Sequence, residues 1–193
     1  MNVGIFCGSN PGTRPAYRAA ADALGETLAR AGHGVIYGGA AVGLMGAVAD
    51  GALRVGGHVV GVLPRFLAQN GRELGHPGLS ELVITETLHE RKALMAARAQ
   101  AFIALPGGFG TLDELFEILT WAQLGLHACP VLLLDIEGFF APLQAMVDHM
   151  IESGFLRAAH RTLYARVATV AEVPHALATF TAAPLPPKWT ERP

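Results

Sequence analysis

Short runs of apolar residues alternate with longer amphipathic stretches along most of this 193-residue chain. The apolar runs predict strands at 3–7, 34–37, 58–63, 82–85, 101–105, 131–134 and 166–170. The stretches between them have helical periodicity at 15–31, 44–55, 88–99, 112–124, 140–152 and 173–180. Strands that alternate with helices indicate right-handed crossovers and a parallel sheet. We therefore expect an α/β fold with a doubly wound parallel sheet of about seven strands and helices on both faces.

The pattern continues without a linker, so we expect one domain over residues 1–182, followed by a proline-rich tail at 183–193. The longest irregular connection covers residues 65–81. Long loops in compact domains are often functional, and this one is a candidate for a substrate lid.

Composition narrows the class of protein. Hydrophobic residues make up 51% of the chain and charged residues only 16%, below the roughly 25% that is usual; the apolar surplus favours a homodimer. The net charge of −2 argues against nucleic acid as a partner.

No apolar run approaches the ~18 residues of a membrane span, and the N-terminus does not resemble a signal peptide. Two lone cysteines, Cys7 and Cys129, are typical of thiols in a reducing cytoplasm.

Three glycine-rich connections follow predicted strands, at residues 7–12, 38–43 and 106–111. The carboxyl ends of parallel strands share one edge of a sheet, where ligands bind. None of these loops has the Gly-Lys-Ser/Thr string of a P-loop, and none has the glycine spacing and following acid of a nicotinamide or flavin site. The eight histidines form no metal-binding pattern. We expect a ligand approached closely by backbone and no metal.

The strongest motif is Pro-Gly-Gly-Phe-Gly-Thr-Leu-Asp-Glu at 106–114, which follows a buried strand and opens a helix. Its glycines allow close approach to an anion, and the first amides of the helix would bind a phosphate. Thr111 is placed to cap this helix. Glu114 then has two interpretations, because a Thr-x-x-Glu string is also a capping box in which the carboxylate is only structural.

A cationic partner for this motif lies upstream, in Glu90-Arg91-Lys92. Arg91 shares a helix face with apolar residues, and a guanidinium on such a face needs an anionic partner. An ion pair with Glu114 or with Asp113 would satisfy it without any catalytic role. Arg98 lies near the same face and is more simply a solvated charge at the end of the helix.

At these residues the sequence resembles the LOG family of cytokinin riboside 5'-monophosphate phosphoribohydrolases, long mislabelled as lysine decarboxylases. The resemblance rests on Glu90-Arg91-Lys92, on the 106–114 motif and on Thr120-Trp121-Ala122-Gln123-Leu124-Gly125, with further matches in family order over nearly the whole chain. It implies a Rossmann-like sheet, a homodimer and a need for neither metal nor nicotinamide. The implied reaction cleaves the N-glycosidic bond of N6-modified AMP and gives free base and ribose 5-phosphate.

Residue by residue, the resemblance makes Arg91 and Glu114 the catalytic pair. The implied nucleotide contacts are Ser9, Glu73, Arg91, Lys92, Gly107, Gly108, Phe109, Gly110, Thr111, Leu112, Asp113 and Thr120. Two departures from the family pattern are Ala40, where many members have a third glycine, and the segment 96–100, so Arg98 receives no family role.

The residue types suit the chemistry. A carboxylate such as Glu114 can stabilise an oxocarbenium-like sugar or activate water, whereas Arg91 holds its proton too firmly to donate it and would act electrostatically. A non-catalytic nucleotide carrier and a broad AMP nucleosidase are the alternatives. A pyridoxal-phosphate decarboxylase is disfavoured, because it needs a Schiff-base lysine and the chain offers only Lys92 outside the tail.

Overall fold

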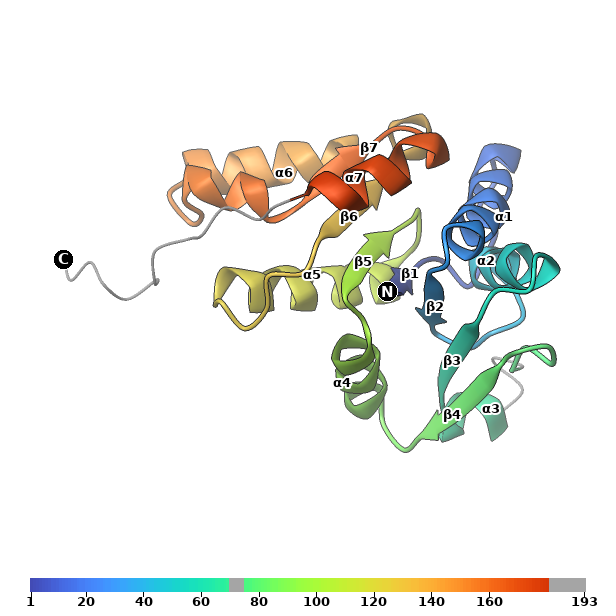
Figure 1. Cartoon of the computed structure of the whole chain (residues 1–193). Helices are drawn as coiled ribbons and strands as arrows, with labels where there is room; N and C mark the ends of the chain where they lie inside the picture. The colour runs from blue at the N-terminus through green and yellow to red at the C-terminus, as the bar shows by residue number, and fades with distance from the viewer. Residues whose placement is uncertain (70–74, 181–193) are drawn as a thin grey trace.

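Seven parallel strands form a single sheet in the order β4-β3-β2-β1-β5-β6-β7 (Figure 1). We describe it from a computed structural model that covers residues 1–69 and 75–180. The strands are β1 (Asn2–Phe6), β2 (Gly34–Tyr37), β3 (Val59–Pro64), β4 (Glu81–Thr85), β5 (Ala101–Ala104), β6 (Val131–Leu134) and β7 (Ala165–Val167). The predicted doubly wound parallel sheet is confirmed.

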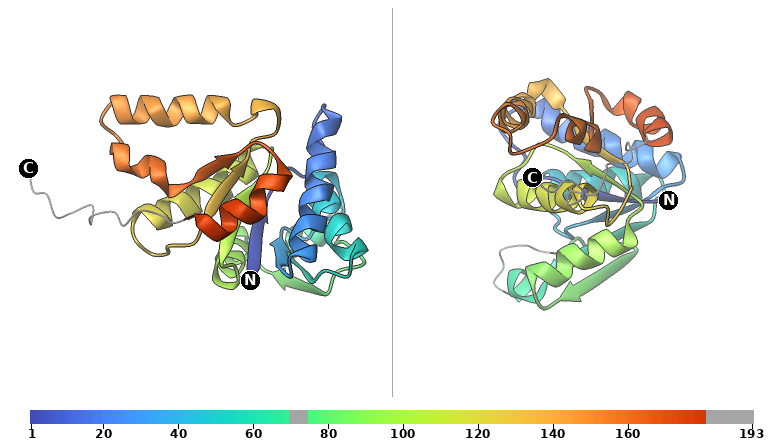
Figure 2. Two further views of the ribbon diagram at one scale, coloured as in Figure 1. Left: turned by 45° about the horizontal axis from the view of Figure 1, so that its top comes forward. Right: turned by 90° about the vertical axis from the view of Figure 1, so that its left-hand side faces the viewer.

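Helices connect successive strands and flank both faces of the sheet (Figure 2). The α-helices are α1 (Pro15–Arg30), α2 (Gly43–Arg54), α3 (Arg65–Gln69), α4 (Leu88–Arg98), α5 (Phe109–Gln123), α6 (Ala141–Glu152) and α7 (Val173–Thr179). Short 3-10 turns at η1 (Ile136–Gly138), η2 (Ala158–Leu163) and η3 (Val170–Glu172) complete the connections.

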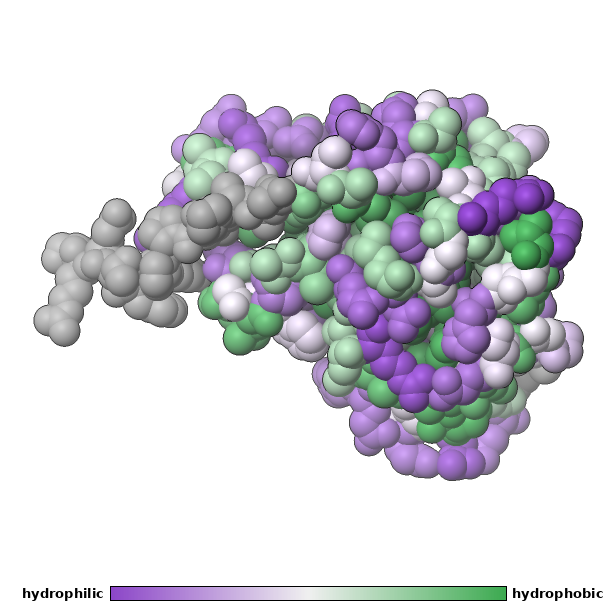
Figure 3. All heavy atoms as spheres, in the orientation of Figure 1, coloured by the Kyte–Doolittle hydropathy of each residue, from purple (hydrophilic) through white to green (hydrophobic). Residues whose placement is uncertain are grey.

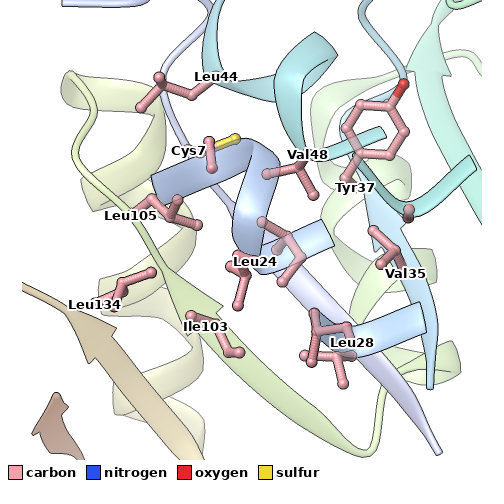
Figure 4. Packing of buried hydrophobic residues seen from close by; sticks show 14 of the residues in the cluster. Cys7, Leu24, Leu28, Val35, Tyr37, Leu44, Val48, Ile103, Leu105 and Leu134 are labelled. Atoms are coloured by element: carbon pink, nitrogen blue, oxygen red, sulfur yellow. The ribbon is translucent and has the colours of Figure 1, made fainter. Parts of the chain in front are cut away.

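Two hydrophobic cores lie on opposite faces of the sheet, because successive side chains of a strand alternate between its faces. In β5, Ile103 packs into the core beneath α1, α2 and α7, where Figure 4 shows it near Leu24 and Leu134. The adjacent Phe102 and Ala104 point the other way, into the core beneath α4 and α5. The central strands are buried on both faces, which explains why their sequences read as continuous apolar runs.

Strand β1 lies at the centre of the sheet, with β2 on one side and β5 on the other. The chain winds outward from β1 through β2, β3 and β4, then returns to the middle and winds the other way through β5, β6 and β7. The order reverses between β1 and β5, so the loops that follow these two strands diverge and leave room for a ligand.

Local differences from the predicted elements are few. The connection predicted as irregular begins with the short helix α3, which has no buried residue and hence no amphipathic signal. The last strand is β7 at Ala165–Val167, where 166–170 was predicted. Residues 70–74 of the predicted lid and the whole of the predicted tail at 183–193 lie outside the described residues. Among the described residues, no helix has the length and hydrophobicity to cross a membrane.

Candidate active site

A cavity of about 430 Å³ lies at the carboxyl ends of the strands, where the loops after β1 and β5 diverge. The two loops are joined by a hydrogen bond of 3.1 Å from the Gly8 amide to the Pro106 carbonyl. The Gly8 carbonyl accepts a further bond from the amide of Leu44, which fixes the start of α2 at the same wall. The cavity therefore occupies the position expected for a ligand in a doubly wound sheet.

The N-terminus of α5 opens into this cavity. Gly108 is the N-cap residue, and the first intrahelical hydrogen bond runs from the Leu112 amide to the Gly108 carbonyl, at 3.1 Å. The amides of Phe109, Gly110 and Thr111 occupy the first helical positions, which have no acceptor within the helix. These amides and the positive end of the helix dipole form a site for an anion.

The predicted role of Thr111 as the helix cap is wrong. Helix α5 begins at Phe109, three residues before the predicted start, so Thr111 is the third residue of the helix and is buried. Residues 106–111 were predicted as a glycine-rich connection, but the chain is already helical from Phe109, although glycine has a poor helix propensity. The interpretation of Glu114 as part of a capping box is therefore wrong as well, because the N-cap is Gly108 and no side chain caps this helix.

Gly107 brings the loop and the helix into close contact. A Cβ atom added there would overlap the Thr111 hydroxyl and would lie 2.9 Å from the Gly8 amide nitrogen. No larger residue fits between these groups without moving backbone, so the absence of a side chain at Gly107 sets the shape of the cavity floor.

Arg91 and Glu114 form a buried ion pair on the cavity wall. Arg91 Nη2 lies 3.2 Å from Glu114 Oε1, and the two residues are only 8% and 9% exposed. Arg91 comes from the first turn of α4, which Thr87 caps by accepting the Glu90 amide at 3.1 Å. Glu114 comes from the second turn of α5, so two helix starts hold the pair. The predicted pairing of Arg91 with an acid of the motif is present.

Burial and the ion pair both shift the pKa of the nearby thiol of Cys7. Cys7 is the buried residue that follows β1. Burial and, after it, the negative charge of Glu114 raise the pKa of the Cys7 thiol far above its ordinary value, against a smaller opposing effect of Arg91. The thiol therefore stays protonated and serves as an apolar wall rather than a nucleophile.

Lys92 also lines the cavity and is held between two acids of α5. Its Nζ lies 3.0 Å from Asp113 Oδ2 and 3.2 Å from Glu117 Oε1. Burial disfavours the charged amine, but these two acids outweigh it and raise the pKa of Lys92 above its ordinary value. Lys92 is therefore a fixed positive charge at the cavity.

Most of the nucleotide contacts predicted from the sequence meet at this cavity. Its walls include Ser9, Arg91, Lys92, Gly107, Gly108, Phe109, Gly110, Thr111, Asp113 and Glu114. Leu112 instead packs toward the core beneath α5, and Glu73 lies outside the described residues. Arg98 pairs with Glu81 of β4 at 2.9 Å, in keeping with its assignment as a charge without a role at the site.

Thr120 does not reach the cavity. It lies on the exposed side of α5, where its hydroxyl donates to the Phe116 carbonyl at 2.7 Å. Eleven residues separate it from the start of the helix, which corresponds to roughly 16 Å along the helix axis.

The cavity also has an apolar part of its wall that the sequence did not predict. Tyr17 of α1 and Phe139, which follows η1, meet edge to face with ring centroids 5.9 Å apart, and both line the cavity. Leu44 and Met45 of α2 add to this side. Neither aromatic residue belongs to a glycine motif, so only the tertiary fold reveals them.

The order of the strands and the cavity at the point where this order reverses are typical of a Rossmann-like α/β protein, with a ligand site at the carboxyl ends of the strands. Two solved structures share this fold at low identity. The molybdenum cofactor binding protein from Rippkaea orientalis aligns with a TM-score of 0.71 and 18% identity, over 92% of this chain and 95% of that one. The Moco carrier protein from Chlamydomonas reinhardtii aligns with a TM-score of 0.69 and 22% identity, over 93% and 96%.

Sequence comparison gives the family. The family model described as possible lysine decarboxylase matches residues 45–177. A probable cytokinin riboside 5'-monophosphate phosphoribohydrolase from Oryza sativa subsp. japonica is 43% identical over 92% of this chain and 78% of its own length. The cytokinin riboside 5'-monophosphate phosphoribohydrolase of Rhodococcoides fascians is 45% identical, over 83% and 81%. This chain therefore belongs to the LOG family, and the resemblance seen in the sequence is confirmed.

Proposed function

We propose that this protein hydrolyses the N-glycosidic bond of adenosine 5'-monophosphate and its N6-modified derivatives, as a phosphoribohydrolase of the LOG family. The observation that carries the proposal is the buried Arg91–Glu114 pair, which shares a cavity with the N-terminus of α5. The names of the relatives, which are cytokinin riboside 5'-monophosphate phosphoribohydrolases, support it.

The 5'-phosphate would bind at the start of α5. The amides of Phe109, Gly110 and Thr111 supply donors, and the helix dipole favours a negative charge there. Lys92 adds a positive charge, and Ser9 and Asp113 lie at the same cavity with groups that can bond to phosphate or ribose oxygens. A phosphate held at this end of α5 places the ribose within reach of Glu114, on the next turn of the helix.

In the reaction, the bond between the ribose C1' and the base nitrogen breaks, and water supplies a hydroxyl group to C1' and a proton to the base. Positive charge develops on the sugar as the bond lengthens. The Glu114 carboxylate opposes this charge or removes a proton from the attacking water. Arg91 keeps its proton and acts by holding the carboxylate in place and by stabilising negative charge on the substrate. No metal or cofactor enters this proposal.

The direct test is to incubate the purified protein with AMP and with N6-isopentenyl-AMP and to measure the released base by chromatography. We expect release from nucleotides and a far lower kcat/KM for adenosine, since adenosine lacks the group that the helix start binds. Equal kcat/KM for AMP and adenosine would contradict the phosphate site. Tight AMP binding without any base release would favour the carrier alternative instead.

The same assay tests the carboxylate. Glu114→Gln keeps the size of the side chain and removes its charge, so we expect kcat to fall roughly 10²-fold or more. The matched control is Asp22→Asn, which also removes a carboxylate from a pair with an arginine, Arg54 at 2.7 Å, but lies on α1 outside the cavity. A Glu114→Gln enzyme with the rate of the Asp22→Asn control would exclude Glu114 from the chemistry.

We also propose that the protein works as a homodimer in the cytoplasm. An exposed stripe on α5 supports the dimer, since Phe109, Phe116 and Leu124 follow one another at helical spacing and are 93%, 38% and 49% exposed. Figure 3 shows hydrophobic surface around the C-terminal end of this helix. Thr120 lies on the same stripe, so its predicted nucleotide contact would be made in the cavity of the second copy.

A further inference from the structure

Gly38, the first residue after β2, is buried and lies against the side chain of Arg91. Its φ angle is not in the left-handed region, where glycine is favoured. The φ angle therefore does not require a glycine at this position, and we look for the reason in the atoms that surround it.

The space that a side chain would take at Gly38 is filled by Arg91. A Cβ atom built there would overlap Arg91 Nη2 and would lie 3.1 Å from Arg91 Cζ and 2.8 Å from Met45 Sδ. The guanidinium thus lies directly against the backbone at the end of β2, although the two residues are 53 positions apart in the chain.

The hydrogen bonding of the Arg91 guanidinium within the described residues is incomplete at Nε. Its Nη2 pairs with Glu114 at 3.2 Å, whereas its Nε is buried and has no hydrogen-bond partner among the described residues. A guanidinium that is held by an incomplete set of hydrogen bonds depends on packing for its position. The backbone at Gly38 supplies part of that packing.

We infer that Gly38 is a positioning residue for the proposed reaction: its lack of a side chain keeps the Arg91 guanidinium within pairing distance of Glu114. The inference rests on the proposed function only for its effect on catalysis, because the packing itself is independent of the substrate. Gly38→Ala has to move the guanidinium, and Met45, a flexible side chain, cannot make room by itself because the nearest atom belongs to Arg91.

The test compares Gly38→Ala with Gly78→Ala, a control in which the new Cβ would meet His76 Cε1 at an ordinary 3.4 Å, outside the cavity. We expect Gly38→Ala to lower kcat for AMP by about tenfold to a hundredfold. KM should change less than kcat, because the phosphate site at α5 does not include Gly38. Gly78→Ala should leave both unchanged. A purely structural defect at Gly38 would reduce the amount of folded enzyme without this split between kcat and KM.

A double-mutant cycle with Arg91→Ala makes the result decisive even if Gly38→Ala folds poorly. If the guanidinium is what the new Cβ meets, removing it opens the space, and the loss of Tm caused by Gly38→Ala should largely disappear in Gly38→Ala/Arg91→Ala. A loss of Tm that is equal in both backgrounds would overturn the inference. Inactivity of the wild-type protein toward every nucleotide would refute the proposed function and leave this thermal comparison valid.

Discussion

At the scale of single residues, Cys7 shows how strongly the site acts on its neighbours. The thiol lies at the end of the central strand, packed near Leu44 and Leu105 (Figure 4). Its pKa is raised by burial and then by the Glu114 charge above the ordinary value of about 9.0, which we expect the thiol to keep in the unfolded chain. The folded state therefore binds a proton that the unfolded state releases as the pH rises.

This difference predicts a loss of stability at alkaline pH. The stabilising effect of the raised pKa is complete below about pH 9 and declines as the pH rises further, at up to about 1.4 kcal/mol per pH unit for one group. Urea unfolding at pH 8 and at pH 10 should show a smaller decline for Cys7→Ala than for the wild type. Parallel declines in the two proteins would mean that Cys7 ionises as easily when folded as when unfolded.

Residue types alone indicated the chemistry of Arg91 and Glu114 but left two roles open for Glu114. A carboxylate three residues after a threonine is as typical of a capping box as of catalysis. Whether the capping box can form depends on where α5 begins, and this depends on packing, since Gly107 lies between the Thr111 hydroxyl and the Gly8 amide. Contacts between segments about 100 residues apart cannot be predicted from the local sequence.

At the scale of elements, helices α1 and α2 owe their close packing to two glycines. A Cβ on Gly25 of α1 would overlap the Val48 carbonyl oxygen, and a Cβ on Gly51 of α2 would overlap the Asp22 carbonyl oxygen. The two helices therefore touch backbone to backbone, on the face of the sheet that carries the larger core (Figure 2).

We expect Gly51→Ala to lower the free energy of unfolding by about 1–3 kcal/mol, because the methyl group forces the two backbones apart. The better helix propensity of alanine does not offset this cost. In a chain of this length, Tm should fall by roughly 2–4 °C for each kcal/mol. Calorimetry checks the value, and kcat at a temperature well below Tm should stay normal, since neither glycine lines the cavity. An unchanged Tm would show that the helices separate freely.

The elements themselves were largely predictable, for a physical reason. Strands buried on both faces are continuous apolar runs such as Ala101–Ala104, and the main helices bury a stripe of regular spacing. The exception, α3, has no buried residue and is too short to show a period. Such a short helix depends on tertiary contacts for its stability, and these contacts cannot be predicted from its own five residues.

At the scale of the whole molecule, the apolar stripe on α5 predicts the assembly. Placing a charge at its centre with Phe116→Asp should convert the proposed dimer into a monomer, because burying an unpaired carboxylate in an interface is costly. Light scattering or sedimentation at micromolar concentration measures the mass. The control is Ala178→Asp, at an exposed position of α7 on the other face of the sheet, which should leave the mass unchanged. A wild-type protein with monomeric mass would refute the predicted dimer.

The cavity as a whole was the least predictable feature. The glycine-rich connections in the sequence predicted the floor of the cavity. Its apolar side comes from Tyr17 on α1 and Phe139 after β6, which the sequence did not indicate. These residues meet only because β1 and β6 flank β5 in the finished sheet. A site built from several crossovers follows from topology, and the sequence predicts that topology only in outline.

The central place of β1 also determines when the cavity can appear during synthesis. Val3 pairs with Val35 early in the chain, but its other partner, Ala101, is made nearly 100 residues later. Until then one edge of an apolar strand has open hydrogen-bonding groups, which favours association between nascent chains. Phe139, which forms part of the cavity wall, is synthesised later still. Catalytic competence should therefore emerge only near the end of folding, and premature termination should yield aggregation-prone fragments without partial activity.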